Sequence, residues 1–225
     1  TDVETNEYDG SSWTAGGDMN TGRSTAYGTG VQTAALAAGG RIQNNPFAYT
    51  ANSEEYNGTS WTEGNNLGAV KYYTNRTGAG IQTAALMVGG YDASAGSPTS
   101  NVEEYNGTSW SEVNNAPEVL LAIAGCGTQT AAIFTGNAPN PTRNKVYLYD
   151  GTNWTISPAA AGSFEARTFA GTQASGIVAA GAASTIICER WDGTTFSQTA
   201  NLSTARESHS ASSGTLAANY VCGGN

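Results

Sequence analysis

The sequence predicts an all-β fold, a closed ring of five β-sheets with four antiparallel strands in each. Three observations lead to this prediction. A motif with an aromatic residue, a turn and a second aromatic residue occurs five times along the chain. A second motif, which ends in Gly-Gly in its clearest copies, also occurs five times and alternates with the first. The chain has 29 glycines and only 12% charged residues, a composition typical of short strands joined by tight turns.

The first motif reads Glu7-Tyr8-Asp9-Gly10-Ser11-Ser12-Trp13 in its first copy. Its first aromatic residue recurs in steps of 48, 49, 44 and 42 residues. Asp-Gly or Asn-Gly between the aromatic residues predicts a hairpin with a type I′ turn, which requires positive φ at both central positions. We expect the aromatic pairs to pack between neighbouring sheets: Tyr8 with Trp13, Tyr56 with Trp61, Tyr105 with Trp110, Tyr149 with Trp154, and Trp191 with Phe196.

The second motif covers residues 32–40 and 82–90, with weaker copies at 129–137, 174–182 and 216–224. It predicts a short, Ala-rich apolar strand inside the ring. The Gly-Gly that follows permits a bulge or a close approach of two backbones. In the first complete unit we expect strands at 25–30 and 33–39, a third strand ending at Tyr56 and a fourth beginning near Ser60.

This order of strand, Gly-Gly, variable loop, Tyr, turn and Trp resembles the kelch repeat, and the resemblance covers essentially the whole chain. It implies a β-propeller in which each repeat is one four-stranded blade. The sequences of the two motifs also resemble repeats in structural proteins of marine tailed phages, notably cyanophages. The motifs that carry this resemblance are Gly-x-Gln-Thr-Ala-Ala-Leu-x-x-Gly-Gly and Glu-Tyr-Asn-Gly-Thr-Ser-Trp. That second resemblance implies a virion or extracellular location.

The two ends of the sequence predict a five-bladed β-propeller closed by a shared blade. The chain opens on a third and a fourth strand, at 3–8 and 12–14, and finishes on a first and a second, at 209–213 and 216–224. Joining these halves leaves no open sheet edge. The expected blade units are approximately 16–65, 66–115, 116–158, 159–200, and 201–225 joined with 1–15, which together form one domain.

The lengths of the loops between second and third strands predict one face suited to binding. Gly40 and Tyr56 lie 16 residues apart, whereas Ala182 and Trp191 lie only 9 apart, and the rest of each unit is nearly constant in length. Insertions in repeat proteins commonly collect on the binding face. The expected contact residues in these loops are Arg41, Phe47, Tyr49, Tyr91, Asp92 and Arg143. The alternative is that these side chains only cover the ends of the sheets.

An enzyme is not expected. Galactose oxidase resembles this chain by repeat type, but its copper site needs more than one histidine and this chain has only His209. Five-bladed glycosidases use carboxylates that converge on the axis, and the candidates here are Asp18, Glu118, Glu165 and Glu207. Only Glu165 and Glu207 share the same position relative to their Gly-Gly motif, so glycoside hydrolysis is kept as a second alternative. No metal or cofactor is expected.

Charge and cysteine content narrow the partners further. The net charge is −9 with only two lysines and no basic run, so we expect no nucleic-acid partner. No apolar stretch is long enough to insert into a membrane. Cys126, Cys188 and Cys222 are too far apart for a metal or redox motif and are expected to be small buried side chains. The chain starts at Thr1 without a methionine, from which we expect a segment of a larger protein.

These observations favour a non-enzymatic structural or adhesion module, a fibre or decoration domain of a virion. Its expected partners are other virion proteins or a host-surface glycan. The first alternative is a lectin-like propeller with related carbohydrate pockets between blades.

Overall fold

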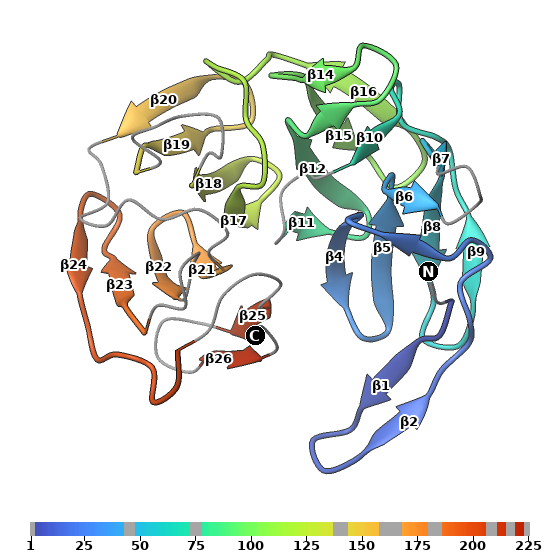
Figure 1. Cartoon of the computed structure of the whole chain (residues 1–225), viewed down its shortest axis with the longest axis horizontal. Coiled ribbons are helices and arrows are strands. Elements are labelled where there is room, and N and C mark those ends of the chain that lie inside the picture. Colours follow the sequence, from blue (N-terminus) through green and yellow to red (C-terminus); the bar gives the residue numbers. More distant parts are fainter. Residues whose placement is uncertain are drawn as a thin grey trace.

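The computed structural model describes residues 3–42, 48–72, 78–136, 144–157, 168–179, 186–205, 211–214 and 219–222, the last two by their backbone only. In these residues the fold is all-β, and every strand pair is antiparallel. The main sheets stand around a common axis with the first strand of each innermost (Figure 1). The described residues contain no helix that could cross a membrane.

Four sheets have four strands each, in the order of the sequence. Sheet 1 consists of β4 (Tyr27–Val31), β5 (Ala34–Ala38), β8 (Ser53–Tyr56) and β9 (Trp61–Glu63). Sheet 2 consists of β11 (Ala79–Ile81), β12 (Ala84–Val88), β15 (Val102–Tyr105) and β16 (Trp110–Val113). Sheet 3 consists of β17 (Ala124–Thr128), β18 (Ala131–Thr135), β19 (Val146–Tyr149) and β20 (Trp154–Ser157). Sheet 4 consists of β21 (Thr168–Thr172), β22 (Ser175–Ala179), β23 (Cys188–Trp191) and β24 (Phe196–Gln198). The strands expected in the first complete unit are confirmed to within two residues.

Two hairpins complete the set of large elements. The first is β1 (Asn6–Tyr8) with β2 (Trp13–Ala15), and the second is β25 (Ala211–Gly214) with β26 (Asn219–Cys222). Each forms a separate two-stranded sheet among the described residues. Their union into one shared blade therefore stays a prediction.

Two of the variable loops contain strands that the sequence did not predict. Ribbon 1 consists of β3 (Arg23–Ser24), β6 (Arg41–Ile42) and β7 (Ala48–Tyr49). Ribbon 2 consists of β10 (Lys71–Tyr72), β13 (Tyr91–Asp92) and β14 (Ser97–Pro98). In each ribbon the segment leading into the first strand of a unit pairs with the loop between the second and third strands of that unit.

The predicted type I′ turn is wrong. In the copy at Asn57–Ser60 only Gly58 has positive φ, at 88°, because the described non-glycine residues with positive φ are Thr25 and Ala122. The side-chain oxygen of Asn57 accepts the N–H groups of Thr59 and Ser60, each at 2.9 Å. In the first copy the same contacts, from Ser12 and Ser11, hold the pKa of Asp9 well below its usual range. The Asn or Asp therefore shapes the turn through its side chain.

The apolar core lies between sheets. Residues of sheets 1 and 2 form one cluster around Tyr27, Leu36, Met87 and Tyr105. Equivalent clusters join sheet 2 to sheet 3 and sheet 3 to sheet 4. The aromatic pairs of sheets 2, 3 and 4 belong to these clusters between sheets. Within each pair of sheets 1 to 4 the two rings lie 4.8–5.0 Å apart by centroid.

A glutamine in the second motif links successive sheets through polar bonds. The Nε2 group of Gln82 donates to Ala35 O at 3.0 Å and to Tyr56 O at 2.7 Å, both in the preceding sheet. Gln129 and Gln173 make the same two bonds one and two sheets further on. This glutamine satisfies carbonyl groups in the second and third strands of its neighbour.

A tyrosine hydroxyl makes a second link. The hydroxyl of Tyr56 donates to Glu7, that of Tyr105 to Glu55 and that of Tyr149 to Glu104 at 2.9 Å. In each case the glutamate belongs to the preceding unit. Burial and then the adjacent Glu55 carboxylate raise the pKa of Tyr105, and burial and Glu104 do the same to Tyr149.

The Gly-Gly motif permits close contact between one unit and the next. Gly89 has φ of 61°, and a Cβ atom on it would lie 2.2 Å from the carbonyl oxygen of Leu120. The N–H of Gly90 donates to that same oxygen at 2.8 Å. Both a positive φ and the absence of a side chain are therefore required here.

Gly89→Ala should lower the free energy of unfolding by about 3 kcal/mol or more, because strain at positive φ adds to a backbone clash. Gly96 is a matched control, with φ of 66° and nothing within 4 Å of an added Cβ. Gly96→Ala should cost only about 1–2 kcal/mol. Urea unfolding of both variants measures the difference, and equal losses would contradict the close-approach role of Gly89.

The tyrosine–glutamate links predict loss of stability at alkaline pH. An unfolded tyrosine ionises near pH ~10, whereas the folded hydroxyl of Tyr105 keeps its proton to higher pH. The contribution is complete below pH ~10 and is lost as the pH rises towards the folded pKa, by at most about 1.4 kcal/mol per pH unit for each proton. Tyr105→Phe should make the free energy of unfolding fall less steeply above pH ~10, measured by urea unfolding at several pH values. An unchanged slope would contradict the raised pKa.

Candidate functional site

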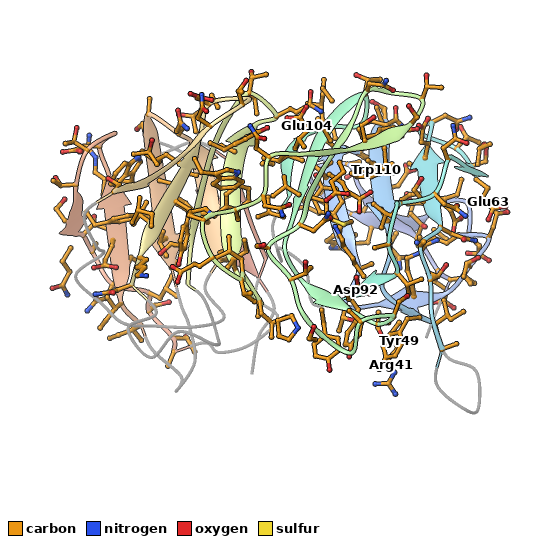
Figure 2. All side chains as sticks on the ribbon, turned by 90° about the horizontal axis from the view of Figure 1, so that it is seen from above. Arg41, Tyr49, Glu63, Asp92, Glu104 and Trp110 are labelled. Atoms are coloured by element: carbon orange, nitrogen blue, oxygen red, sulfur yellow. The ribbon has the colours of Figure 1, made fainter. Side chains whose placement is uncertain are left out.

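The two ribbons lie on one side of the sheets, which we call the loop face. Figure 2 shows Arg41, Tyr49 and Asp92 at this side of the molecule and Glu104, next to a hairpin turn, at the opposite side. The opposite side, formed by the hairpin turns, is the turn face. The predicted division into a decorated face and a uniform face therefore agrees with the positions of these residues.

A continuous row of side chains crosses both ribbons. In ribbon 1, Arg41 pairs with Tyr49 across the strands, and in ribbon 2, Tyr72 pairs with Tyr91. Cross-strand partners project from the same side of a sheet. The rings of Tyr49 and Tyr72 are stacked, 4.0 Å apart by centroid and 13° from parallel. Tyr91 follows at 5.0 Å from Tyr72.

We call Tyr49, Tyr72 and Tyr91 the tyrosine row. All three are half-buried, as is Arg41 at its end. The hydroxyl of Tyr91 donates to Gly96 O at 2.5 Å, which fixes its ring against the β13–β14 turn. The row thus joins the loops of two adjacent units into one amphipathic surface.

Three of the six predicted contact residues come together in one row, and a fourth lies on the opposite side of ribbon 2, because Asp92 pairs with Lys71. Arg41, Tyr49 and Tyr91 lie along the row, and Asp92 follows Tyr91 on β13. The Asp92 carboxylate accepts the N–H groups of Ser94 and Ala95 at 2.8 and 3.0 Å, so it shapes its own turn. Phe47 and Arg143 lie outside the described residues.

Tyr72, at the centre of the row, was missed by the sequence analysis. Its position is equivalent to that of Ser24, one residue after a basic side chain that precedes the first strand of its unit. The pair Lys71-Tyr72 was a weak signal for a short strand, because side chains alternate between opposite faces along a strand.

The inward face of each ribbon holds a buried ion pair. Arg23 in β3 contacts Glu54 with an N–O distance of 2.5 Å, and Lys71 in β10 contacts Glu103 at 2.8 Å. All four side chains are almost fully buried. These pairs tie both ribbons to the third strands beneath them.

Each ion pair is completed by further hydrogen bonds. Arg23 donates from Nη1 to Gly39 O at 3.1 Å and to Asn52 O at 2.8 Å. Lys71 also donates to the side chain of Asn101, and Glu103 accepts the N–H of Gly68 at 2.7 Å. The loop face therefore stands on a rigid polar base, which holds the outward-facing row in one arrangement.

The repeated aromatic residues of the hairpins are not exposed for binding in the complete sheets. Tyr56, Tyr105, Tyr149 and Trp191 are buried, and Trp110 is nearly so. The indole N–H of Trp61 donates to Thr5 and that of Trp154 to Asn114 O. Tyr8 and Trp13 differ, since both are exposed. The buried aromatic side chains of the complete sheets therefore serve packing between sheets.

Of the four carboxylates considered for glycoside hydrolysis, the structure describes Glu118 and Asp18. Glu118 accepts from the Lys145 ammonium at 2.9 Å and from the hydroxyl of Tyr147. Asp18 is exposed. Glu165, Glu207 and His209 lie outside the described residues. The innermost strands β4, β11, β17 and β21 carry no carboxylate.

Metal and thiol chemistry find no support in the part of the chain that the structure describes. It contains no group of three His, Cys, Asp or Glu side chains that could hold a metal ion. Cys126 and Cys188 are buried free thiols, as expected, and burial raises the pKa of both.

Comparison with known proteins supports the fold. No protein-family model matches the chain, and no curated protein matches it. The chain is similar to the solved structure described as "Structure of YjhT", with a TM-score of 0.82 and 13% identity. That similarity covers 99% of this chain and 84% of the other. The repeated four-stranded sheets and this similarity together show a β-propeller-like all-β fold.

Lys71→Ala should lower the free energy of unfolding by about 3–5 kcal/mol, because it leaves the Glu103 carboxylate buried without its cation. Lys145→Ala is the matched control, since Lys145 and Glu118 are both about one third exposed. The control should cost less than about 1 kcal/mol. Urea unfolding compares the two, and a small loss for Lys71→Ala would show that the ribbons do not depend on their ion pairs.

Proposed function

We propose that the chain is a non-enzymatic structural or adhesion module of a virion, and that the loop face is its contact surface. The observation that carries this proposal is the tyrosine row with Arg41 at its end. Tyr and Arg are the side chains most enriched at the centres of protein interfaces. The row draws on two adjacent units, so it presents a larger surface than either loop alone.

The rigidity of this surface also supports a role in binding. The ribbons are paired strands, and the ion pairs of Arg23 and Lys71 anchor them from below. A surface held in its binding arrangement loses little conformational entropy on contact with a partner. Catalysis has no comparable support, because the described candidate Glu118 is bonded to Lys145 and Tyr147.

The fold itself is proposed to be a five-bladed kelch-like ring. Sheets 1 to 4 are four of its blades, and the hairpins β1–β2 and β25–β26 are the two halves of the fifth. The recurrence of the glutamine and tyrosine links at successive sheets supports one repeated geometry around the ring.

The proposed phage origin rests on the sequence of the repeats, and it can be tested on particles of a phage that carries the gene. Antibodies raised against the purified chain should label intact particles by immunogold electron microscopy. Phage carrying Tyr49→Ala and Tyr91→Ala together should adsorb to host cells at least about 10-fold more slowly, because central aromatic contacts carry most of the binding energy. Phage carrying Glu63→Ala, an exposed residue on β9, should adsorb normally. Unlabelled particles, or normal adsorption of the double variant, would contradict the proposal.

A carbohydrate-binding role is the second candidate. It is favoured by the side-by-side arrangement of half-buried tyrosines and Arg41, which offers apolar rings together with hydroxyl and guanidinium groups. A panel of defined glycans immobilised on a surface tests it with the wild-type chain and Tyr91→Ala. Binding by the wild type that the variant loses identifies the loop face as a glycan site, and no binding to any glycan leaves a protein contact.

A further inference from the structure

The hairpin β1–β2 is placed against sheet 1 as the third and fourth strands of a preceding blade would be. Tyr56 donates its hydroxyl to Glu7 just as Tyr105 does to Glu55 one sheet later. The carbonyl of Thr5 accepts the N–H of Gly16, as the carbonyl of Ser53 accepts that of Gly64 in sheet 1. Thr5 is thus the equivalent of Ser53.

Among the described residues, β1 lacks the second-strand neighbour that the third strands of sheets 1 to 4 have. Tyr8 is 47% exposed and Trp13 is 69% exposed. The equivalent tyrosines Tyr56, Tyr105 and Tyr149 are at most 2% exposed. In sheets 1 to 4 the second strand of the same sheet pairs with this edge. The outer edge of β1 is therefore a strand edge that has no such partner among the described residues.

The glutamine link identifies what is missing. Gln82, Gln129 and Gln173 each donate to one carbonyl of a second strand and one of a third strand in the preceding sheet. Gln32 is exposed and donates only a long bond of 3.4 Å to Glu7 among the described contacts. A cavity of about 480 Å³ lies beside it, lined in part by Glu7, Ala35 and Trp61. By equivalence, the third-strand carbonyl that Gln32 should bind is that of Tyr8. No second strand lies next to β1 among the described residues to supply the other carbonyl.

The strand β26 has the geometry of that absent second strand. It follows β25 with Gly214 opposite Asn219, as Gly30 lies opposite Ala35 in sheet 1. The strand β25 lies against β21 of sheet 4, as β21 lies against β17. Asn219 is therefore the equivalent of Ala35, the residue whose carbonyl Gln82 binds.

We propose that the outer edge of β1 is the docking site for β26 of the same chain. This inference rests on the proposed five-bladed ring and specifies how the ring closes. By equivalence with sheet 1, Tyr8 lies opposite Asn219 and Thr5 lies opposite Cys222. The Nε2 group of Gln32 then donates to Asn219 O and Tyr8 O, and the cavity beside it is filled. Pairing also covers the ring of Tyr8.

The residues that precede the third-strand aromatics agree with this closure. In sheet 4 the third-strand aromatic is Trp191, which has no hydroxyl that could bond a glutamate. The residue of sheet 3 at the glutamate position is Leu148, and it packs against the cluster that contains Trp191. The same position in sheet 4 is Arg190, which is exposed. In the closed ring its neighbour is Tyr8, and an arginine over a tyrosine ring is a favourable pair.

The proposed register can be tested by a disulfide. In sheet 1 the N–H of Gly39 donates to Asn52 O, so the adjacent pair, Ala38 and Ser53, is a non-hydrogen-bonded pair. Thr5 and Cys222 are its equivalents. Such a pair has Cα atoms about 4.5 Å apart, within the range that a disulfide spans.

Thr5→Cys, mildly oxidised, should form an intrachain disulfide with Cys222 in a monomer, detected by size-exclusion chromatography and peptide mass mapping. Asn6→Cys is the matched control and should not cross-link, because adjacent residues of a strand project to opposite faces. A disulfide-linked dimer would show that β26 comes from a second copy and would overturn the proposal. A folded Thr5→Cys variant without any cross-link would overturn it as well.

Hydrogen exchange of the wild-type chain gives a test that does not depend on a variant. The bond between Thr5 and Gly16 turns the N–H groups of Asn6 and Tyr8 away from β2. If β26 docks, these two amides should exchange on the order of 100-fold more slowly than exposed amides. Fast exchange at both would overturn the proposal. Either result is independent of phage adsorption, which tests only the loop face.

Discussion

Two kinds of polar link join successive sheets of this protein, a glutamine amide and a tyrosine hydroxyl. The glutamine joins sheets 1 and 2, 2 and 3, and 3 and 4, and the tyrosine joins sheets 1 and 2 and sheets 2 and 3. Both cross from one unit to the unit before it, and both end on groups in or beside the third strand. Apolar packing between sheets is not directional, and it alone would allow neighbouring sheets to slide or rotate. The links set the angle and height of each sheet against its neighbour. A ring needs this, because small errors between successive sheets would add up around the axis.

The links also explain which substitutions the repeat tolerates. The residue before the third-strand aromatic is glutamate where the next unit supplies a tyrosine hydroxyl, and it is leucine where the next unit supplies Trp191. The Gly-Gly motif follows the same principle, because its second N–H bonds to backbone of the following unit. The residues that recur between copies of the repeat therefore make contacts between units more than contacts within them.

With the sheets held in this way, the loop face is free to differ from unit to unit. Ribbons 1 and 2 extend beyond the sheets, yet each sends one basic side chain inward to a buried glutamate and turns the next residue outward. The inward residues give rigidity and the outward ones form a surface. The tyrosine row arises because Tyr49 of one unit and Tyr72 of the next are stacked, and neither unit could form it alone.

The sequence by itself determined the all-β class, the order of strands in the four-stranded sheets, their approximate limits in the first complete unit, and the division into two unlike faces. It could do so because strand alternation, Gly-containing turns and repeat spacing are local properties. It predicted four of the residues on the loop face from loop length and residue type, although Asp92 shapes its own turn and the turn type at Asn57–Ser60 was wrong. That turn is decided by side-chain hydrogen bonds that compete with backbone pairing.

Only the tertiary structure decided that the insertions become paired ribbons, that Tyr72 completes a row and that Arg23 and Lys71 are buried. Each of these depends on residues from different strands or units meeting in space, which no local pattern encodes. The same is true of the edge of β1. Its exposed Tyr8 and Trp13 can be recognised as unusual only when the buried equivalents in the other sheets are seen beside them.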